Sequence, residues 1–535
     1  MKKWKKTALT QMIDAGEIIK KKDAKKISND EFFKRLFITD GHLSILGNLQ
    51  DVIVAPPGFG KSTLFRLLTT KKGIDLLKRY ASLSEYKYYG FVRDAEYWLD
   101  NYEFIYGYDR SNDSASKLKD SFKDLKCLWC YLLIESLLKI PGVGERLSLF
   151  NIPTDKNQRL LFFQDLHDLT EGYSFYNKYY SHNETPLKFF ESVDKNLKLL
   201  DKKLCILYDD FDLSYQDSYL LVNSLLEFWA CISRCDQIVP KIFLDSLMSE
   251  QLCTRYELRA FHRKYLTWHD KDDYYVLEPF QLALHNWLKA SDAYPNPLYT
   301  SGIVKEKKGA RCSAEGVKRI VDRMVEKYPK TRFTNKNTSF FESWLRYHVV
   351  SAKERLGFGS MYTSPVVFSL IFSEAAKIRL SASDGYELPD NCLFTQEDIK
   401  QGMAKAPVKI IELFYYDCAP WLTDLKDIIR PTIIKGKGIQ DIPIYKLLQA
   451  CNYISANYDL SNIPGDKLFV KYDFNKSQAI DLDLRYGAGD FSNPDVFKIL
   501  NFLHTYRFIE TMRNLRHQVR LGPIYTPYFT GEVNV

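Results

Sequence analysis

The chain has 535 residues, 45% of them hydrophobic, so it is long enough for several packed domains. Its net charge of +8 is modest for this length and unevenly distributed. No apolar run reaches the roughly 18 residues that a membrane span needs, and no apolar stretch follows the lysine-rich N-terminus as it does in a signal peptide. We therefore expect a cytoplasmic protein that does not span a membrane.

The N-terminal segment MKKWKKTALTQMIDAGEIIKKKDAKK carries its lysines in two clusters. Such clusters contact phosphates or acidic partners in some proteins, but a solvated amphipathic arm or helix is the preferred interpretation. No aromatic platform or groove motif accompanies the lysines. We expect residues 1–45 to form a basic N-terminal arm with helices. This segment is not sufficient to predict nucleic-acid binding.

The stretch VIVAPPGFGKST, residues 52–63, follows the Walker A pattern GxxxxGK[ST] except that Ala55 takes the place of the first glycine. Glycines at the later positions let backbone N–H groups turn toward a phosphate without a Cβ in the way. Alanine is small enough for the first position if its φ stays negative. The predicted nucleotide-binding residues are Pro57, Gly58, Phe59, Gly60, Lys61, Ser62 and Thr63.

The residues on either side of this loop predict the structure that a phosphate site requires. The apolar run DVIVA precedes the loop as a strand, and KSTLFRLLTTKKG follows it with helical spacing that ends near Gly73. The helix N-terminus supplies the positive end of its dipole to the phosphates. Lys61 would place its charge against the β- and γ-phosphates, and the Ser62 hydroxyl would ligate Mg²⁺.

A second strand is predicted at Leu204 to Tyr208, within KKLCILYDDFDLS, and it ends in two acidic residues. Asp209 fits the Walker B role of holding Mg²⁺ beside Ser62, and Asp210 fits the role of polarising the attacking water. An apolar strand that ends in Asp-Asp is common by itself. Together with the upstream loop it predicts a metal-dependent nucleotide site.

APPGFGKST and CILYDDFD together resemble the AAA+ superfamily, in particular its signal-transduction (STAND) and origin-recognition-like branch. The sequence has no LSGGQ-like signature of ABC or SMC proteins and no NKxD of a GTPase. The resemblance implies a parallel-sheet P-loop fold and Mg²⁺-dependent hydrolysis of ATP. It also implies a role in phage defence or in a DNA transaction. This role is an expectation for the family as a whole.

The sensor positions depart from the AAA+ pattern. The strand predicted at VPKIFLDSLMSE ends in Asp245 and Ser246, where relatives carry Asn, Thr or Arg, and an acidic group there would repel a γ-phosphate. Ser246 is therefore the candidate sensor. The second sensor position carries Thr363, Ser364 and Pro365 in place of arginine.

Several arginines are candidates for the missing cationic roles, although an exposed surface charge explains each of them as well. Arg346 and Arg355 precede the second sensor position. The candidates for trans-acting arginine fingers are Arg255, Arg259 and Arg263.

The chain is predicted to divide into four parts. After the arm, residues 46–292 form the nucleotide-binding domain, with a largely helical insertion at about 80–200. Cys127 and Cys130 in this insertion form a CxxC pair, but the surrounding KCLWCYLLIESLL indicates a buried helix and not a metal site. Residues 293–430 form a helical lid, in which Thr395 caps a helix with Asp398 as its capping partner.

The last part, residues 431–535, resembles a winged helix, with the helix PDVFKILNFLHTYRFIE followed by a hairpin near VRLGPIYTPYF. Arg513, Arg516 and Arg520 would supply a basic wing for DNA. Winged helices serve as often in protein interactions, so both partners stay open.

The sequence thus predicts an ATP-binding and ATP-hydrolysing AAA+/STAND-like protein that couples its nucleotide state to a conformational change or to assembly. Lys61, Asp210 and Ser246 are the predicted catalytic residues, and Ser62 and Asp209 the metal ligands. Two alternatives remain: a nucleotide switch with slow turnover, and a scaffold that binds nucleic acid or a partner effector. Homo-oligomerisation is compatible with each.

Overall fold

The computed structural model describes part of the chain, in two compact units. The sheet unit comprises Asp40–Pro56 and Gly60–Leu266, and the second unit comprises Met1–Thr39, Pro57–Phe59 and Thr267–Val535. The described residues are 3–20, 28–35, 52–55, 58, 60–81, 102–109, 118–166, 186–209, 211, 215–233, 235–245, 248–249, 263–265, 325, 365–382, 388–389, 392–416, 418–435, 440–460, 463, 494–506, 508–511, 518–522 and 525–531.

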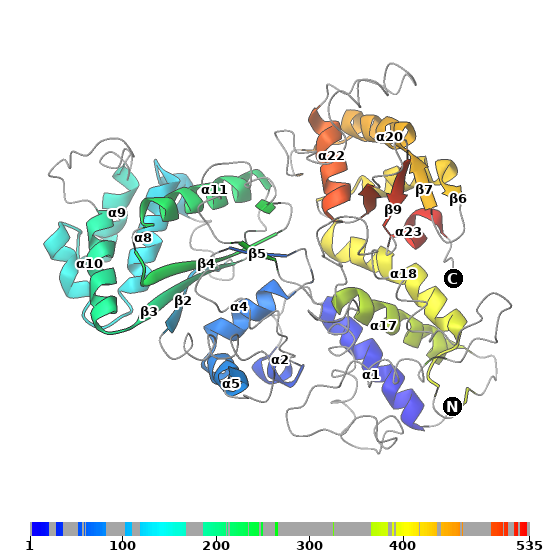
Figure 1. The fold of residues 1–535 in the computed structure, drawn as a ribbon, viewed down its shortest axis with the longest axis horizontal. Helices are drawn as coiled ribbons and strands as arrows, with labels where there is room; N and C mark the ends of the chain where they lie inside the picture. The colour runs from blue at the N-terminus through cyan, green and yellow to red at the C-terminus, as the bar shows by residue number, and fades with distance from the viewer. Residues whose placement is uncertain are drawn as a thin grey trace. The chain divides into compact units, whose positions relative to one another are not determined.

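The sheet unit is built on a parallel sheet of five strands in the order β2-β3-β4-β1-β5 (Figure 1). Every neighbouring pair of strands is parallel. This sheet confirms the predicted mixed α/β fold with a parallel core. The strands are β1 (Val52–Val54), β2 (Tyr102–Asp109), β3 (Lys203–Asp209), β4 (Ile238–Leu244) and β5 (Arg263–Tyr265).

The central strands are buried on both faces, which explains their continuous runs of apolar residues. Successive residues of a strand point to opposite faces. Ile206 and Tyr208 of β3 join a large hydrophobic cluster with helices on one face, whereas Phe243 of β4 contacts Phe65 on the other, with ring centroids 6.1 Å apart. The sheet therefore separates two packed layers.

The crossover connections place helices on both faces of the sheet. β1 connects to β2 in one direction, and β2, β3 and β4 connect onward in the opposite direction. Because parallel crossovers are right-handed, the two sets of helices must cover opposite faces, as Figure 1 shows. The first set is α4 (Lys61–Thr69) and α5 (Lys71–Ala81), and the second is α8 (Leu125–Leu137), α9 (Lys156–Asp165), α10 (Pro186–Leu199) and α11 (Tyr215–Cys231), with the 3-10 helices η2 (Lys119–Ser121) and η3 (Gly144–Phe150).

The stretch at about 80–200 differs from the largely helical insertion that we predicted. It contains β2, which pairs with β3 and belongs to the core sheet. The helices α8, α9 and α10 follow, and α8 is buried almost all round. Cys127 and Cys130 lie in this buried helix, where burial raises the pKa of the Cys130 thiol. Among the described residues, no cluster of His, Cys, Asp and Glu has the arrangement of a metal site.

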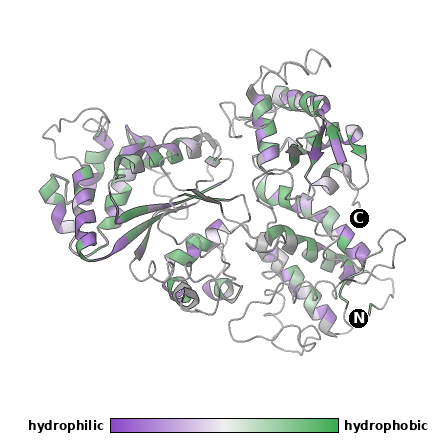
Figure 2. Cartoon of the chain, viewed as in Figure 1, coloured by the Kyte–Doolittle hydropathy of each residue, from purple (hydrophilic) through white to green (hydrophobic). Residues whose placement is uncertain are grey.

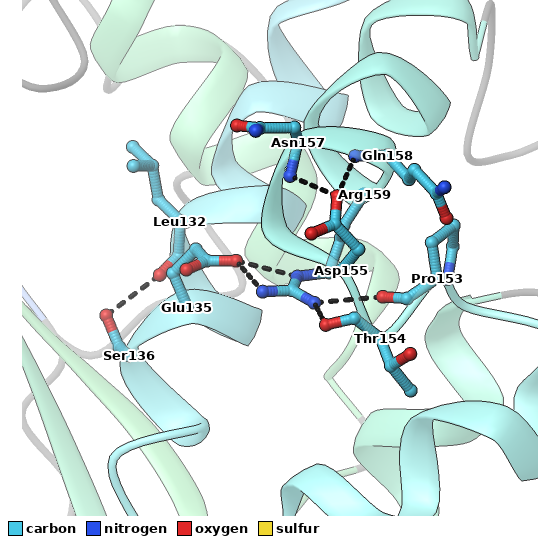
Figure 3. A network of polar contacts seen from close by, with 9 residues as sticks. All are labelled: Leu132, Glu135, Ser136, Pro153, Thr154, Asp155, Asn157, Gln158 and Arg159. Carbon is cyan, nitrogen blue, oxygen red and sulfur yellow. Dashed lines mark hydrogen bonds and ion pairs between the residues drawn. The ribbon is translucent and has the colours of Figure 1, made fainter.

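An ion pair joins α9 to α8 inside the sheet unit (Figure 3). Arg159 is 3% exposed, and its guanidinium lies 2.6 Å from Glu135 Oε1. The same guanidinium donates to the carbonyls of Pro153 and Thr154 at 2.9 and 2.8 Å. Asp155 caps the start of α9 by accepting from two backbone N–H groups. These contacts fix the turn that leads into α9.

In the second unit, three helices form a layered group. α1 (Lys3–Lys20) packs on α17 (Pro365–Ser381), which packs on α18 (Gln396–Phe414). α17 is hydrophobic around most of its circumference, green in Figure 2, because helices cover it on two sides. α2 (Asn29–Arg35) precedes this group in the chain. Thr395 accepts from the Asp398 backbone N–H and Asp398 accepts from that of Thr395, which confirms the predicted cap.

The N-terminal segment is not simply a solvated basic arm. α1 is joined to the helix group of the second unit, and Lys5 in the first lysine cluster is 5% exposed. Its Nζ donates to the carbonyls of Leu388 and Pro389 at 2.8 and 2.6 Å. The hydrophobic face of α1 is stable only when other residues cover it. The burial of Lys5 is tolerated because its ammonium donates hydrogen bonds to these carbonyls.

The C-terminal part of the second unit is an antiparallel sheet in the order β6-β7-β9-β8, with helices around it. Its helix α22 precedes the β8–β9 hairpin, but the predicted bounds were wrong: the helix ends at Thr505, the end of the predicted helix forms β8, and part of the predicted hairpin forms α23. The winged-helix assignment stays a prediction. The elements are α19 (Leu422–Ile429), η6 (Arg430–Thr432), β6 (Ile434–Lys435), β7 (Gln440–Pro443), α20 (Ile444–Asn457), α22 (Pro494–Thr505), β8 (Ile509–Thr511), β9 (Gln518–Leu521) and α23 (Thr526–Thr530).

No helix in the described part of the chain is both long and apolar enough to cross a bilayer.

Candidate nucleotide-binding site

The parallel sheet has a natural ligand-binding edge at the carboxyl ends of its strands. The chain leaves β1 toward β2 and leaves the neighbouring β4 toward β5, in opposite directions. Such a switch point opens a crevice outside the strand ends, because the two connections go to opposite faces of the sheet. The glycine-rich loop begins at the end of β1, so it starts at this switch point.

The loop uses its glycines where the backbone requires them. Gly58 has φ 80° and Gly60 has φ 96°, both in the left-handed region that side chains disfavour. Ala55, at the position of the missing glycine, is fully buried, and its N–H donates to Leu244 O at 3.1 Å. The alanine thus continues the pairing of β1 with β4. Pro57 and Phe59 lie outside the described residues.

Lys61 is the first residue of α4, and its Nζ donates to Ala55 O at 2.6 Å. The ammonium is therefore folded back over the loop from the start of the helix. Ser62 and Thr63 follow in the first turn and are half-buried. No acidic residue lies in this turn, so the positive end of the helix dipole is not offset there. This arrangement favours an anion at the loop.

Asp209 is the last residue of β3 and is 2% exposed. β4 is the strand between β3 and β1, so Asp209 and the loop lie on the same edge of the sheet. Asp245 directly follows β4 on that edge and is half-buried. Lys61, Ser62, Asp209 and Asp245 thus all lie at the same edge of the sheet. Asp210 and Ser246 lie outside the described residues.

The strand end that carries Asp209 is held by a cluster of aromatic rings. Tyr208 is 1% exposed and packs in T-shaped pairs with Trp129 and Trp229, at centroid distances of 6.0 and 6.2 Å. Burial raises the pKa of the Tyr208 hydroxyl, so it stays neutral. Trp129 Nε1 donates to Ser224 Oγ at 2.8 Å, which ties α8 to α11. This packing fixes the backbone from which the Asp209 carboxylate projects.

Magnesium prefers oxygen ligands, commonly one or two carboxylates together with substrate phosphates and water. The Ser62 hydroxyl and the buried Asp209 carboxylate supply such oxygens at the phosphate edge. The residues present therefore fit a magnesium ion bound with a nucleotide.

The remaining predicted site residues are not brought to this edge by the described structure. Arg263 lies in β5 and pairs in register with Val52, the first residue of β1. Pro365 begins α17. The other candidates lie outside the described residues: Arg255, Arg259, Arg346, Arg355, Thr363 and Ser364.

Arg520, one of the three arginines predicted for the wing, forms an ion pair within the protein. It lies in β9, and its Nε donates to Asp441 Oδ1 on β7 at 3.2 Å. Both side chains are largely buried, with exposures of 12% and 16%. This ion pair joins two strands and limits any role of Arg520 in DNA contact. Arg513 and Arg516 lie outside the described residues.

Asp109, which ends β2 in register beside Asp209, was not among the residues that the sequence pattern singled out. The signal was present, because YEFIYGYD is rich in the aromatic residues that favour strands and ends in an acid, as KLCILYD does in β3. The strand was not predicted because the surrounding sequence is rich in helical patterns.

No family model matches this sequence, and no curated protein matches it. Among solved structures, the chain is similar to a Walker-type ATPase of Pyrococcus abyssi, at 10% identity and a TM-score of 0.35, over 92% of this chain and 94% of that one. It is also similar to Cdc6p of Pyrobaculum aerophilum, at 12% identity and a TM-score of 0.22, over 89% and 85%. These TM-scores are too low to assign the fold, so the class of protein is inferred from the chain's own geometry.

Proposed function

We propose that this protein is a P-loop ATPase of the AAA+ type, which binds ATP at the carboxyl edge of its parallel sheet and hydrolyses it with Mg²⁺. One observation carries the proposal: Lys61 begins a helix after a loop with left-handed Gly60, and the buried Asp209 ends a strand on the same edge. One strand, β4, lies between the two strands that carry them.

Each of these residues has a defined role in the proposed chemistry. The loop N–H groups and Lys61 bind the β- and γ-phosphates, for which the ammonium leaves the Ala55 carbonyl. Ser62 and Asp209 hold the magnesium ion, which when bound neutralises charge on the phosphates. Asp210 orients the attacking water, and Ser246 contacts the γ-phosphate. ATP is preferred over GTP on the basis of the AAA+ resemblance alone.

A slow nucleotide switch is the second candidate, and the position of Asp245 favours it. This acidic residue follows β4, the strand next to β1, where a neutral or cationic sensor would stabilise the γ-phosphate. A negative charge at that edge disfavours the charge that develops in the transition state. ATP would then set the conformation or assembly of the protein with little turnover.

The test measures ATP binding and hydrolysis by the wild type and by Lys61→Ala and Asp209→Asn variants. Loss of the charged hydrogen bonds of Lys61 is expected to weaken binding about 10- to 100-fold. Asp209→Asn is expected to reduce turnover by about 100-fold or more. Lys71→Ala is the matched control, because it removes an exposed lysine ten positions further along the chain and should leave both measurements unchanged.

Binding by the wild type with negligible turnover would favour the switch. Equal ATP binding by the wild type and Lys61→Ala, or no binding by either, would refute the nucleotide site.

Contact of the C-terminal part with DNA stays a separate proposal. Its test is a salt titration, since binding through phosphates must weaken steeply as the salt concentration rises.

A further inference from the structure

The indole of Trp129 contacts residues on both sides of Asp209 in the sequence. Trp129 lies on α8 and is fully buried. Its ring forms T-shaped pairs with Tyr208 and with Phe211, at centroid distances of 6.0 and 6.2 Å. Phe211 is 6% exposed and belongs to the same hydrophobic cluster as Tyr208. A single side chain of α8 therefore holds the chain before and after the strand end.

These two contacts define the direction in which Asp209 projects. Successive residues of a strand point to opposite faces, so residues 208 and 211 would lie on opposite faces if β3 continued. β3 ends at Asp209, and both aromatic rings pack on the same indole. Because Tyr208 faces the cluster of α8 and α11, the alternation directs Asp209 to the other face, which α4 covers.

Hydrogen bonds to α11 fix the orientation of the indole. Trp129 Nε1 donates to Ser224 Oγ at 2.8 Å and to Leu221 O at 3.1 Å. Ser224 is 7% exposed, and its hydroxyl donates to Leu221 O at 2.9 Å, so its oxygen accepts from the indole. A buried indole requires such a partner for its N–H group. The plane on which Tyr208 and Phe211 pack is thus set by α11.

The position of the Asp209 backbone matters because magnesium tolerates little displacement of its ligands. The ion requires near-octahedral geometry with ligand distances of about 2.0–2.1 Å. An aspartate side chain has only two rotatable bonds, so its carboxylate follows a movement of the backbone. Residues that orient a metal ligand without touching the metal typically contribute about 10- to 100-fold to metal affinity.

We propose that Trp129 is a positioning residue for the magnesium ion of the nucleotide site, and that it acts by holding Tyr208 and Phe211 on either side of Asp209. This inference rests on the proposed ATPase function. Trp129 acts through the backbone of β3, from the face of the sheet opposite to the Asp209 carboxylate. It thereby makes the metal affinity of the site depend on the packing of α8 and α11.

The experiment measures the binding of a fluorescent ATP analogue over a series of Mg²⁺ concentrations, without any need for turnover. Trp129→Phe keeps an aromatic ring but removes the N–H group and part of the ring surface. It is expected to raise the half-saturating Mg²⁺ concentration about tenfold, and Asp209→Asn about 10- to 100-fold. Binding of the analogue by Trp129→Phe in excess EDTA should equal that of the wild type.

Phe211→Leu is the second variant, and it also tests the proposal if Trp129→Phe does not fold. It removes the other ring and leaves the hydrogen bonds of Trp129 in place, so the same shift of about tenfold is expected. If the two residues act through one contact, the double variant should shift the Mg²⁺ dependence no further than the larger single change. Shifts that multiply to about 100-fold would overturn the shared action of the two rings.

Phe190→Leu is the matched control for a general loosening of the core. Phe190 is fully buried in the same hydrophobic cluster, where it packs on Phe228 at a centroid distance of 6.0 Å. Its substitution should lower the melting temperature about as much as Trp129→Phe does, but should leave the Mg²⁺ dependence unchanged. An equal shift of the Mg²⁺ dependence in Phe190→Leu would show that core stability alone is responsible, and the proposal would be wrong.

The outcomes separate the positioning role from the ATPase function. If Asp209→Asn shifts the Mg²⁺ dependence while Trp129→Phe and Phe211→Leu do not, the positioning role is wrong and the ATPase stands. If the wild type binds no nucleotide at any Mg²⁺ concentration, the ATPase function itself fails.

Discussion

Buried charged side chains hold the loops of this protein to its helices. Asp194 on α10 is 8% exposed and accepts from the backbone N–H groups of Asp236, Gln237 and Ile238, at distances of 3.3, 2.6 and 3.1 Å. It thereby fixes the entry into β4, the strand next to the phosphate-loop strand. A buried carboxylate is tolerated at this place because hydrogen bonds replace its hydration. Arg159 does the same for the turn before α9.

Arg159→Met tests this role at the residue scale. The substitution retains much of the side-chain volume but removes the charged hydrogen bonds to Glu135 and to two carbonyls. It also leaves Glu135, 24% exposed, without its partner. We expect the free energy of unfolding to fall by about 2–4 kcal/mol, measured by urea denaturation.

Asp165→Ala is the control for this substitution. It breaks the pair of Lys123 and Asp165, whose side chains are 47% and 77% exposed, so the loss should stay below about 0.5 kcal/mol. Equal stability of Arg159→Met and the wild type would show that the buried network contributes nothing.

At the scale of elements, close helix contacts depend on small residues. Gly16 of α1 lies directly against the Ser373 side chain of α17. On the other side, a Cβ on Gly402 of α18 would lie 2.5 Å from Ile371 O and 3.0 Å from Ala375 Cβ. α17 is therefore enclosed between two helices at distances that only a glycine allows. This explains why its apolar residues extend around the helix.

Gly402→Ala tests this packing. Alanine favours a helix by about 1 kcal/mol over glycine, so a gain in stability would be expected on an exposed helix. Here the Cβ meets backbone that cannot move alone, and overpacking of this kind costs about 1–3 kcal/mol. We expect net destabilisation by about 1–2 kcal/mol in chemical denaturation followed by circular dichroism.

The control for this variant is Lys405→Ala on the same helix, because Lys405 is exposed. Its stability should stay within about 0.5 kcal/mol of the wild type. A Gly402→Ala variant more stable than the wild type would mean that α17 and α18 are less closely packed than described.

For the whole molecule, the division into two units has thermodynamic consequences. The sheet unit has its own hydrophobic cluster around β3, β4, α8 and α11, and the helix group of the second unit has another core around α17. Units with separate cores can unfold in separate transitions. A ligand stabilises only the transition of the unit that binds it.

Calorimetry is expected to resolve two unfolding transitions, and Mg²⁺-ATP is expected to raise only one of them. At a ligand concentration of about 100 times Kd, the stabilisation is about 2.7 kcal/mol. Lys61→Ala should abolish the shift without moving the transition of the second unit. A single transition that ATP shifts as a whole would contradict the independence of the two units.

The sequence by itself determined the elements whose signals are local. The apolar run before the glycine loop, the start of the helix at Lys61 and the strand that ends at Asp209 lie where periodicity predicted them, although this helix ends at Thr69 and not near Gly73. So does the capped start of α18 at Thr395. Such features depend on backbone preferences and on neighbours a few residues away, so they can be recognised without the fold.

Only the tertiary structure decided which of these elements meet. It recruited β2 from a region that the sequence predicted to be helical, joined α1 to α17, and paired Arg520 with Asp441. The pairing of β2 with β3 is the clearest case, because a β-bulge at Gly107 shifts it by one residue and puts Asp109 in register with Asp209. Register between strands that are distant in sequence depends on side-chain packing across the sheet, and no local pattern in either strand contains it.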